Sequence, residues 1–303
     1  MRRLLAATDL SPRSDRAVRR AADLAGPLGA ELLLLYVVDD DQPASLMDAE
    51  RREALLLLRG RAAELAKSAW DPAPRVLVET GDPFDGVIRA AEAQAAHLVV
   101  LGAHRRSLLQ DMFVGTTAER VMRHGGRPVL MVNRPPTGPY RRILAAVDLD
   151  EGSAHALRTA AALGVLDGAD LTVLHGFQAP EKGLMVRADL SRQAVADHLS
   201  ARTREAEAEL ARFLAGIGLD IPSQPRMVAE EGRPATVIKQ AVGRLRPDLV
   251  LMGKGRHGIL RRVLLGSVAA EAVPELECDV LVVPPSASRD GAAAAAGHTS
   301  APP

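Results

Sequence analysis

The feature that most constrains this chain is a glycine motif that occurs at the same place in two related halves. In the first half, the four residues that begin at Gly102 are followed, after nine residues, by Gly115-Thr116. In the second half, the four that begin at Gly253 are followed, again after nine residues, by Gly266-Ser267. Each copy lies between two short apolar runs. Glycine and hydroxyl residues with this spacing are candidates for backbone groups that surround phosphates.

The repeat extends over both halves and predicts their fold class. Asp9 follows the first apolar run and matches Asp148 at an offset of 139 residues, whereas Gly102 matches Gly253 at an offset of 151. The second half therefore holds about a dozen extra residues between its second and third strands. Each half reads as strand, helix, strand, long helix, strand, helix, strand, glycine loop, helix and strand. This alternation predicts an α/β fold with a parallel sheet covered by helices on both faces.

Helix starts and long helices are also visible in the sequence. Ser11-Pro12 and Asp82-Pro83 each place a capping side chain before a proline, which is typical of the first turn of a helix. The segments Ala49 to Ala69 and Ala188 to Ala215 are rich in charge and have a helical period. We expect them to be the long helices of the two halves.

Changes in composition predict the domain boundaries. Residues 134–140 hold three prolines and a glycine and form the expected linker. This linker separates an α/β domain over residues 1–133 from a second over residues 141–285. Residues 286–303 are mostly Ala, Gly, Ser and Pro, and a disordered tail is expected because they offer little apolar surface to bury.

Charge and composition exclude several classes of function. With 38 basic and 38 acidic side chains, the chain has no global charge that would favour nucleic acid or an anionic membrane. No apolar run approaches the ~18 residues of a membrane span, and Asp9 interrupts the apolar start too early for a signal peptide. We expect a cytoplasmic protein without a nucleic-acid or membrane partner. The single cysteine, Cys278, excludes an intrachain disulfide, and its apolar surroundings predict a buried, inert thiol.

The candidate binding residues follow the first and fourth strands of each half. Ligands of open α/β sheets bind at the carboxyl ends of the strands, so Asp9 and Asp148 are expected beside the glycine loops. Each aspartate either accepts hydrogen bonds from adenosine or helps to hold a metal, or else it caps a helix. Gly102 and Gly253 either approach a phosphate or end a strand where a side chain would clash. The sequence motifs of serine hydrolases, zinc proteases and P-loop proteins are absent, so no catalytic residue is assigned.

Together these residues resemble the universal stress protein family in a tandem, two-domain form. The similarity runs from about Arg2 to Val132 and from Arg141 to Pro284. It is carried by Thr8-Asp9-Leu10-Ser11 after the opening strand, by Gly81-Asp82-Pro83, and most strongly by the segment from Gly115 to Val132.

The resemblance implies two tandem Rossmann-like domains, each with five parallel strands, and ATP as the ligand, with Mg²⁺ as an accompanying ion. By position, the residues that would bind the nucleotide in the first half are Asp9, Val37, Gly102, Gly115 and Thr116. In the second half they are Asp148, Gly176, Gly253, Gly266 and Ser267, to which Gly255 and Arg256 of the same loop are added.

The resemblance also implies that the last strand of each domain pairs across a dimer interface. Here we expect Val129 to Val132 and Val280 to Val283 to pair within the chain, so that the two halves form a pseudo-dimer. A homodimer of the whole chain stays open as a second level of assembly.

One departure from the family pattern bears on nucleotide binding. The second glycine of the motif is replaced by Arg105 in one copy and by Arg256 in the other. An arginine blocks a close backbone approach to phosphate, and a positive φ at this place would cost roughly 1–2 kcal/mol. Alternatively, its guanidinium binds the phosphate directly. Because Gly255 and Gly258 lie next to Arg256, we rank the second site above the first.

Three functions are compatible with these observations. The first is a stress-response regulator that binds ATP or a related adenine nucleotide. The second is an interaction module on the same fold that binds no nucleotide, which the arginines favour and the retained Gly-Thr and Gly-Ser pairs oppose. The third, a two-domain α/β enzyme, lacks a set of catalytic residues, so at most weak ATP hydrolysis is expected.

Overall fold

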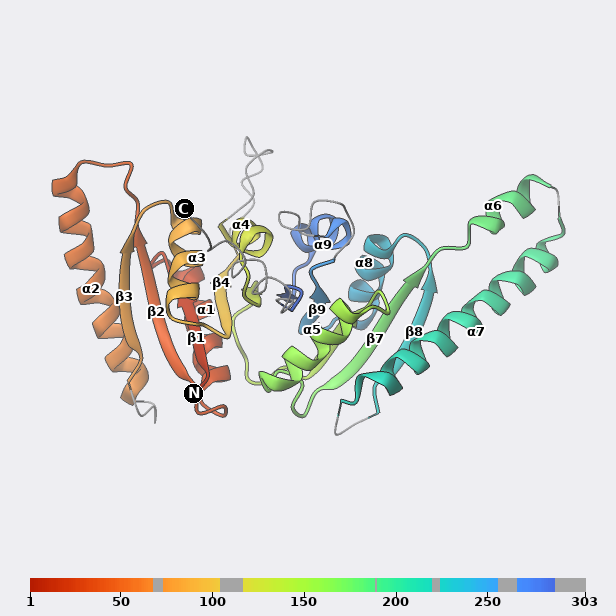
Figure 1. The fold of residues 1–303 in the computed structure, drawn as a ribbon, viewed down its shortest axis with the longest axis horizontal. Helices are drawn as coiled ribbons and strands as arrows, with labels where there is room; N and C mark the ends of the chain where they lie inside the picture. The colour runs from red at the N-terminus through yellow and green to blue at the C-terminus, as the bar shows by residue number, and fades with distance from the viewer. Residues whose placement is uncertain (68–72, 104–116, 189, 220–223, 256–265, 287–303) are drawn as a thin grey trace, which may run out of the picture.

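The computed structural model describes residues 1–67, 73–103, 117–188, 190–219, 224–255 and 266–286. Its strands form one ten-stranded sheet in the order β3-β2-β1-β4-β5-β10-β9-β6-β7-β8, which runs across the molecule in Figure 1. The five strands of each half are parallel to one another. The protein is therefore an α/β protein with two tandem Rossmann-like halves, as the repeat predicts.

The two halves repeat the same order of elements. The first half contains β1 (Arg3–Ala7), α1 (Pro12–Ala25), β2 (Glu31–Val38), α2 (Ala44–Lys67), β3 (Arg75–Thr80), α3 (Pro83–Ala93), β4 (Leu98–Gly102), α4 (Thr117–His124) and β5 (Val129–Val132). The second half contains β6 (Arg142–Ala146), α5 (Glu151–Ala162), β7 (Asp170–Phe177), α6 (Pro180–Arg187), α7 (Arg192–Ile217), β8 (Arg226–Glu231), α8 (Pro234–Leu245), β9 (Leu249–Gly253), α9 (Ser267–Ala272), a short 3-10 turn (Val273–Glu275) and β10 (Asp279–Val283).

Alternating side chains of the strands build a hydrophobic core on each face of the sheet. In β1, Leu4 lies in the core beneath α1, α2, α5 and α7, whereas Leu5 lies in the core beneath α3, α4, α8 and α9. This is why the strands are continuously apolar in sequence. None of the helices in the described part of the chain is both long and apolar enough to cross a membrane.

The predicted helix starts are observed, and the long helices are displaced by a few residues. Ser11 caps α1, and the Asp82 carboxylate caps α3 by accepting a 2.9 Å hydrogen bond from the Phe84 N–H. The helix predicted from Ala188 begins later, because the Ser191 hydroxyl caps α7 through the N–H of Ala194 at 3.1 Å. The extra residues of the second half form α6, which projects beyond the sheet with the start of α7 (Figure 1).

The two halves meet through their last strands. β5 pairs with β10 in antiparallel register, with Met131 opposite Val280 and Val129 opposite Val282. This is the pairing that the sequence analysis expected. Each strand thereby covers the edge that the other would expose to solvent.

A buried polar cluster, defined by Arg20, Asn133, Tyr140 and Asp279, secures this junction. The Asp279 carboxylate accepts hydrogen bonds from the Tyr140 hydroxyl at 2.7 Å and from the Asn133 N–H at 2.9 Å. The Arg20 Nε atom lies 3.6 Å from the same carboxylate, and its Nη1 donates to the Gly138 carbonyl oxygen at 2.6 Å. The proline-rich segment between the halves is thus anchored to both, which the sequence analysis did not anticipate.

Candidate functional site

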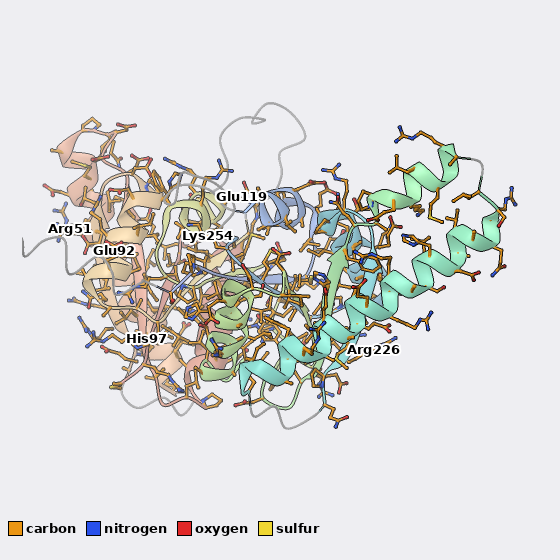
Figure 2. All side chains as sticks on the ribbon, turned by 45° about the vertical axis from the view of Figure 1, so that its right-hand side comes forward. Arg51, Glu92, His97, Glu119, Arg226 and Lys254 are labelled. Carbon is orange, nitrogen blue, oxygen red and sulfur yellow. The ribbon has the colours of Figure 1, made fainter. Side chains whose placement is uncertain are left out.

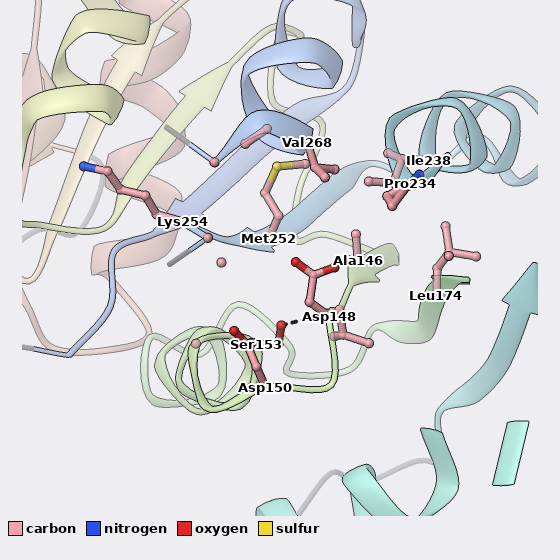
Figure 3. Close-up of a pocket in the computed structure, with 17 residues that line it drawn as sticks. Ala146, Asp148, Asp150, Ser153, Leu174, Pro234, Ile238, Met252, Lys254 and Val268 are labelled. Atoms are coloured by element: carbon pink, nitrogen blue, oxygen red, sulfur yellow. Dashed lines mark hydrogen bonds between the residues drawn. The ribbon is translucent and has the colours of Figure 1, made fainter. Parts of the chain in front are cut away.

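The second half contains a cavity of about 620 Å³ at the carboxyl ends of β6 and β9. These two strands are neighbours in the sheet, as are β1 and β4 in the first half. The cavity is lined by five of the residues predicted from the sequence: Asp148, Gly176, Gly253, Gly255 and Gly266. Its volume lies in the range of about 300–1,000 Å³ that is usual for small-molecule sites. Figure 3 shows these walls, with Met252 and Ile238 among the apolar residues that face the carboxylate of Asp148.

Two close glycine contacts lie beside this cavity. A Cβ on Gly266 would lie 2.9 Å from the Gly255 nitrogen, so a side chain at position 266 would clash with the backbone of Gly255, whereas a Cβ on Gly255 would make an ordinary contact at 3.6 Å. A Cβ on Gly253 would lie 3.1 Å from the Gly152 carbonyl oxygen at the start of α5. The sequence analysis gave two reasons for a glycine at position 253, phosphate binding and the lack of space for a side chain. The second reason is sufficient to explain this glycine.

The first half contains a smaller cavity, of about 280 Å³, at the corresponding place. Three predicted residues line it: Asp9, Val37 and Gly102. Gly102 is again a packing glycine, because a Cβ there would lie 3.1 Å from the Arg13 carbonyl oxygen. The wall also holds Tyr36, whose hydroxyl donates a 2.6 Å hydrogen bond to Glu50. Burial, followed by the Glu50 carboxylate, raises the pKa of Tyr36, so the phenol stays protonated.

The two aspartates at the ends of β1 and β6 have different hydrogen bonds. Ser14 donates to the Asp9 carboxylate at 2.6 Å, and the Ser11 N–H donates to the same oxygen at 3.0 Å. Burial alone would raise the pKa of Asp9, but these hydrogen bonds outweigh it and hold the pKa below its ordinary value. In the second half the corresponding Ser153 hydroxyl accepts a 2.9 Å hydrogen bond from the backbone N–H of Asp148. The Asp148 carboxylate faces the cavity, as Figure 3 shows.

A tight backbone turn follows each aspartate. Leu10 has a φ of 60° and Leu149 a φ of 55°, values in the left-handed region that leucine rarely adopts. Such a conformation costs roughly 1–2 kcal/mol relative to the usual one. It occurs at the same position of both halves, between the aspartate and the helix cap. The turn therefore places the aspartate at the cavity and the cap at the helix in both copies.

Among the described residues, the cation that lines each cavity comes from a different position of the repeat. Arg13, at the start of α1, lines the first cavity, and its counterpart in the second half is Gly152. Lys254, just after β9, lines the second cavity, and its counterpart in the first half is Ala103. The sequence analysis missed both side chains because it followed the features that the halves share. A search for charged residues present in only one copy would have found them.

The remaining predicted residues are Ser267, Gly115, Thr116 and Arg256. Ser267 is the first residue of α9. Gly115, Thr116 and Arg256 lie outside the described residues, and so does Arg105. Among the described residues, one group of three side chains has the spacing for a metal ion: Asp39, Asp40 and Asp41, all exposed. Of the predicted residues, five line the second cavity and three line the first.

Comparison with known proteins identifies the family from both halves of the chain. The sequence model of the Universal stress protein family matches residues 1–133 and 139–284. A universal stress protein of Methanocaldococcus jannaschii is 29% identical over 146 residues, which cover 44% of this chain and 83% of that protein. One from Thermus aquaticus is 33% identical over 147 residues, which cover 48% of this chain and 98% of that protein.

A solved structure shows the same fold over nearly the whole chain. A universal stress protein from Archaeoglobus fulgidus superposes with a TM-score of 0.65 at 18% identity, covering 93% of this chain and 98% of that one. The family model matches both repeats, and each repeat holds one glycine motif and one of the two aspartates. The chain belongs to the universal stress protein family and contains two copies of the family domain in tandem.

Proposed function

We propose that the protein is a stress-response regulator that binds ATP or a related adenine nucleotide in the cavity of the second half. The observation that carries this proposal is the convergence of Asp148, Gly253 and the Gly255–Gly266 pair on one cavity of about 620 Å³. The apolar walls suit an adenine ring, and Asp148 is placed to accept hydrogen bonds from the nucleoside. Amides of the glycine loop are the donors for the phosphates.

The charges around this cavity favour a nucleotide that brings a divalent cation. Two carboxylates, Asp148 and Asp150, line the cavity together with Lys254. Phosphate groups beside two carboxylates are repelled unless a cation lies between them. Carboxylate and phosphate oxygens are the ligands that Mg²⁺ prefers, so we propose that Asp150 meets the ion bound to the nucleotide while Asp148 contacts the nucleoside.

Two measurements test nucleotide binding. In the first, protein purified from cells is denatured, and mass spectrometry should detect an adenine nucleotide that the protein releases. The second is titration calorimetry with ATP and Mg²⁺. Gly266→Val should abolish detectable binding, because its side chain would displace Gly255 and open the loop. Gly243→Val is the matched control, since nothing lies within 4 Å of a Cβ at that glycine, which lies in α8.

An interaction module that binds no nucleotide is the second candidate. The observation that favours it is the replacement of the second motif glycine by arginine in both copies. In the first half, the small cavity with the Tyr36–Glu50 hydrogen bond in its wall also favours a module that binds no nucleotide. Undetectable binding at millimolar ATP, by the native chain and by Arg256→Gly, would make this the better assignment.

A further inference from the structure

Lys254 connects the wall of the second cavity to a helix of the first half. Its backbone N–H donates a 2.7 Å hydrogen bond to the Val283 carbonyl oxygen, which fixes its position at the end of β9. The ammonium group, however, lies 2.5 Å from the Arg123 carbonyl oxygen and 3.5 Å from that of Gly125. Figure 3 shows the side chain extending away from Asp148 and Asp150, and Figure 2 places it in the middle of the molecule.

The two carbonyls belong to the C-terminal end of α4 and the residue that follows it. The last carbonyls of a helix have no partner within the helix and carry partial negative charge. The ammonium of Lys254 satisfies them from the other half of the chain. Because the equivalent of Lys254 in the first half is Ala103, the family fold does not require a lysine here. The lysine therefore serves this particular pairing of the two halves.

The described contacts of the partly buried ammonium are with neutral carbonyl groups. Among the described residues, none of the ion pairs includes Lys254. Burial, followed by the cations Arg123, Lys254 and Arg120, lowers the pKa of His124 on α4. Burial lowers the pKa of Lys254, which reflects the loss of water around its charge. Two neutral carbonyls accept charge-assisted hydrogen bonds, but they lack the net charge of an anion and the Coulomb attraction that comes with it.

We propose that Lys254 is a phosphate-binding residue with two positions, and that its movement links the second cavity to the first half. When a polyphosphate occupies the second cavity, the ammonium leaves the carbonyls of α4 for the phosphate. The last turn of α4 then loses its cap. Since Thr117 and Ala118 at the other end of α4 line the first cavity, the first half responds to occupancy of the second. This inference rests on nucleotide binding in the second cavity.

The test combines hydrogen exchange with titration calorimetry on the full-length chain, with ATP and Mg²⁺ as the probe. In the native chain, ATP should speed amide exchange severalfold in the peptide over residues 117–127. In Lys254→Met, that exchange should be fast before ATP is added and should not change with it. The same substitution should weaken ATP binding about tenfold or more, the scale of a charge-assisted hydrogen bond.

Lys239→Met is the matched control, because Lys239 lies on α8 of the same half and pairs with Glu275 at 3.2 Å. It should leave both readouts as in the native chain. If Lys254→Met bound ATP as tightly as the native chain does, or if ATP left exchange over residues 117–127 unchanged, this inference would be overturned and nucleotide binding would stand. Absence of ATP binding in every variant would instead overturn the proposed function, and this inference with it.

Discussion

A Cβ atom on Gly86 would lie 2.7 Å from the Cγ1 atom of Val37. The absence of a side chain at Gly86 in α3 therefore leaves the space that the Val37 side chain of β2 fills. In the second half the sizes are exchanged, because the repeat places Gly176 at the position of Val37 and Val237 at the position of Gly86. Val37 lines the first cavity and Gly176 the second, so this exchange contributes to the difference between about 280 and 620 Å³.

The first prediction tests this complementary pair. Gly86→Ala should destabilise the protein by about 1–3 kcal/mol, the usual range for overpacking, although alanine is the better helix former. Combining it with Val37→Ala should recover part of the loss in a double-mutant cycle measured by urea unfolding.

The control is Gly60→Ala in α2, where nothing lies within 4 Å of the added Cβ. It should stabilise by up to ~1 kcal/mol. Equal stabilities for Gly86→Ala and Gly60→Ala would show that Val37 and Gly86 do not constrain one another.

The second prediction concerns the buried polar cluster between the halves. Asp279→Ala should lower the free energy of unfolding by about 3–5 kcal/mol, because it leaves the buried Tyr140 hydroxyl without its acceptor and the buried Arg20 guanidinium without its counter-charge. Burial raises the pKa of Tyr140 well above its usual value, so the phenol remains a donor at neutral pH. Asp85→Ala, which breaks the exposed pair with Arg89, should change stability by less than ~1 kcal/mol. Similar effects for the two variants in guanidinium unfolding would contradict the assigned role of the cluster.

The third prediction is a pH dependence that arises from Asp9. Its pKa is held below the ordinary value in the folded chain, so the stability it contributes is present above the unfolded pKa of about 4 and is lost as pH falls through the folded pKa. Ser14→Ala removes one of the hydrogen bonds responsible. The variant should be less stable at pH 7, and the difference from the native chain should shrink in acid. Unfolding at a series of pH values measures it.

Ser153→Ala provides the comparison, because the Ser153 hydroxyl accepts from a backbone N–H and its loss should not depend on pH in the same way. A constant difference between Ser14→Ala and the native chain from pH 7 to pH 3 would refute this account of Asp9.

The repeat allowed much of this architecture to be predicted from the sequence. The spacing of the repeat predicted that Asp9 and Asp148 lie beside the glycine loops, because neighbouring parallel strands end at the same edge of the sheet. This property belongs to the backbone and does not depend on the side chains. The Lys254 contact with α4 was beyond such reasoning, because it joins residues 131 positions apart and has no counterpart in the other half. The same holds for Arg20 and Asp279. Both of these interactions arise from the contact between the halves, which the repeat does not encode.

The fourth prediction concerns the tail, most of which, residues 287–303, lies outside the described residues. Its composition offers little apolar surface to dock, so truncation after Pro285 should leave the melting temperature almost unchanged. Truncation after Cys278 should instead unfold the second half, because it removes β10, which pairs with both β5 and β9. A drop of many degrees on the shorter truncation would mean that the tail packs on the folded core.

The last prediction concerns Arg256, which lies outside the described residues and occupies the place of the second motif glycine. The described cation of the second cavity, Lys254, is bound to α4 in the present structure, and two carboxylates face the cavity. A polyphosphate beside two carboxylates would be stabilised by a cation in addition to Mg²⁺ and a relocated Lys254, and we expect the Arg256 guanidinium to supply it. Arg256→Ala should weaken ATP binding by about 1.5–3 kcal/mol, the scale of a hydrogen bond to a charged group. Titration calorimetry measures it, with Arg244→Ala as the control, since Arg244 pairs with Glu230 and does not line the cavity. Tighter binding by Arg256→Gly would show the opposite, that the arginine obstructs the turn that a glycine would complete.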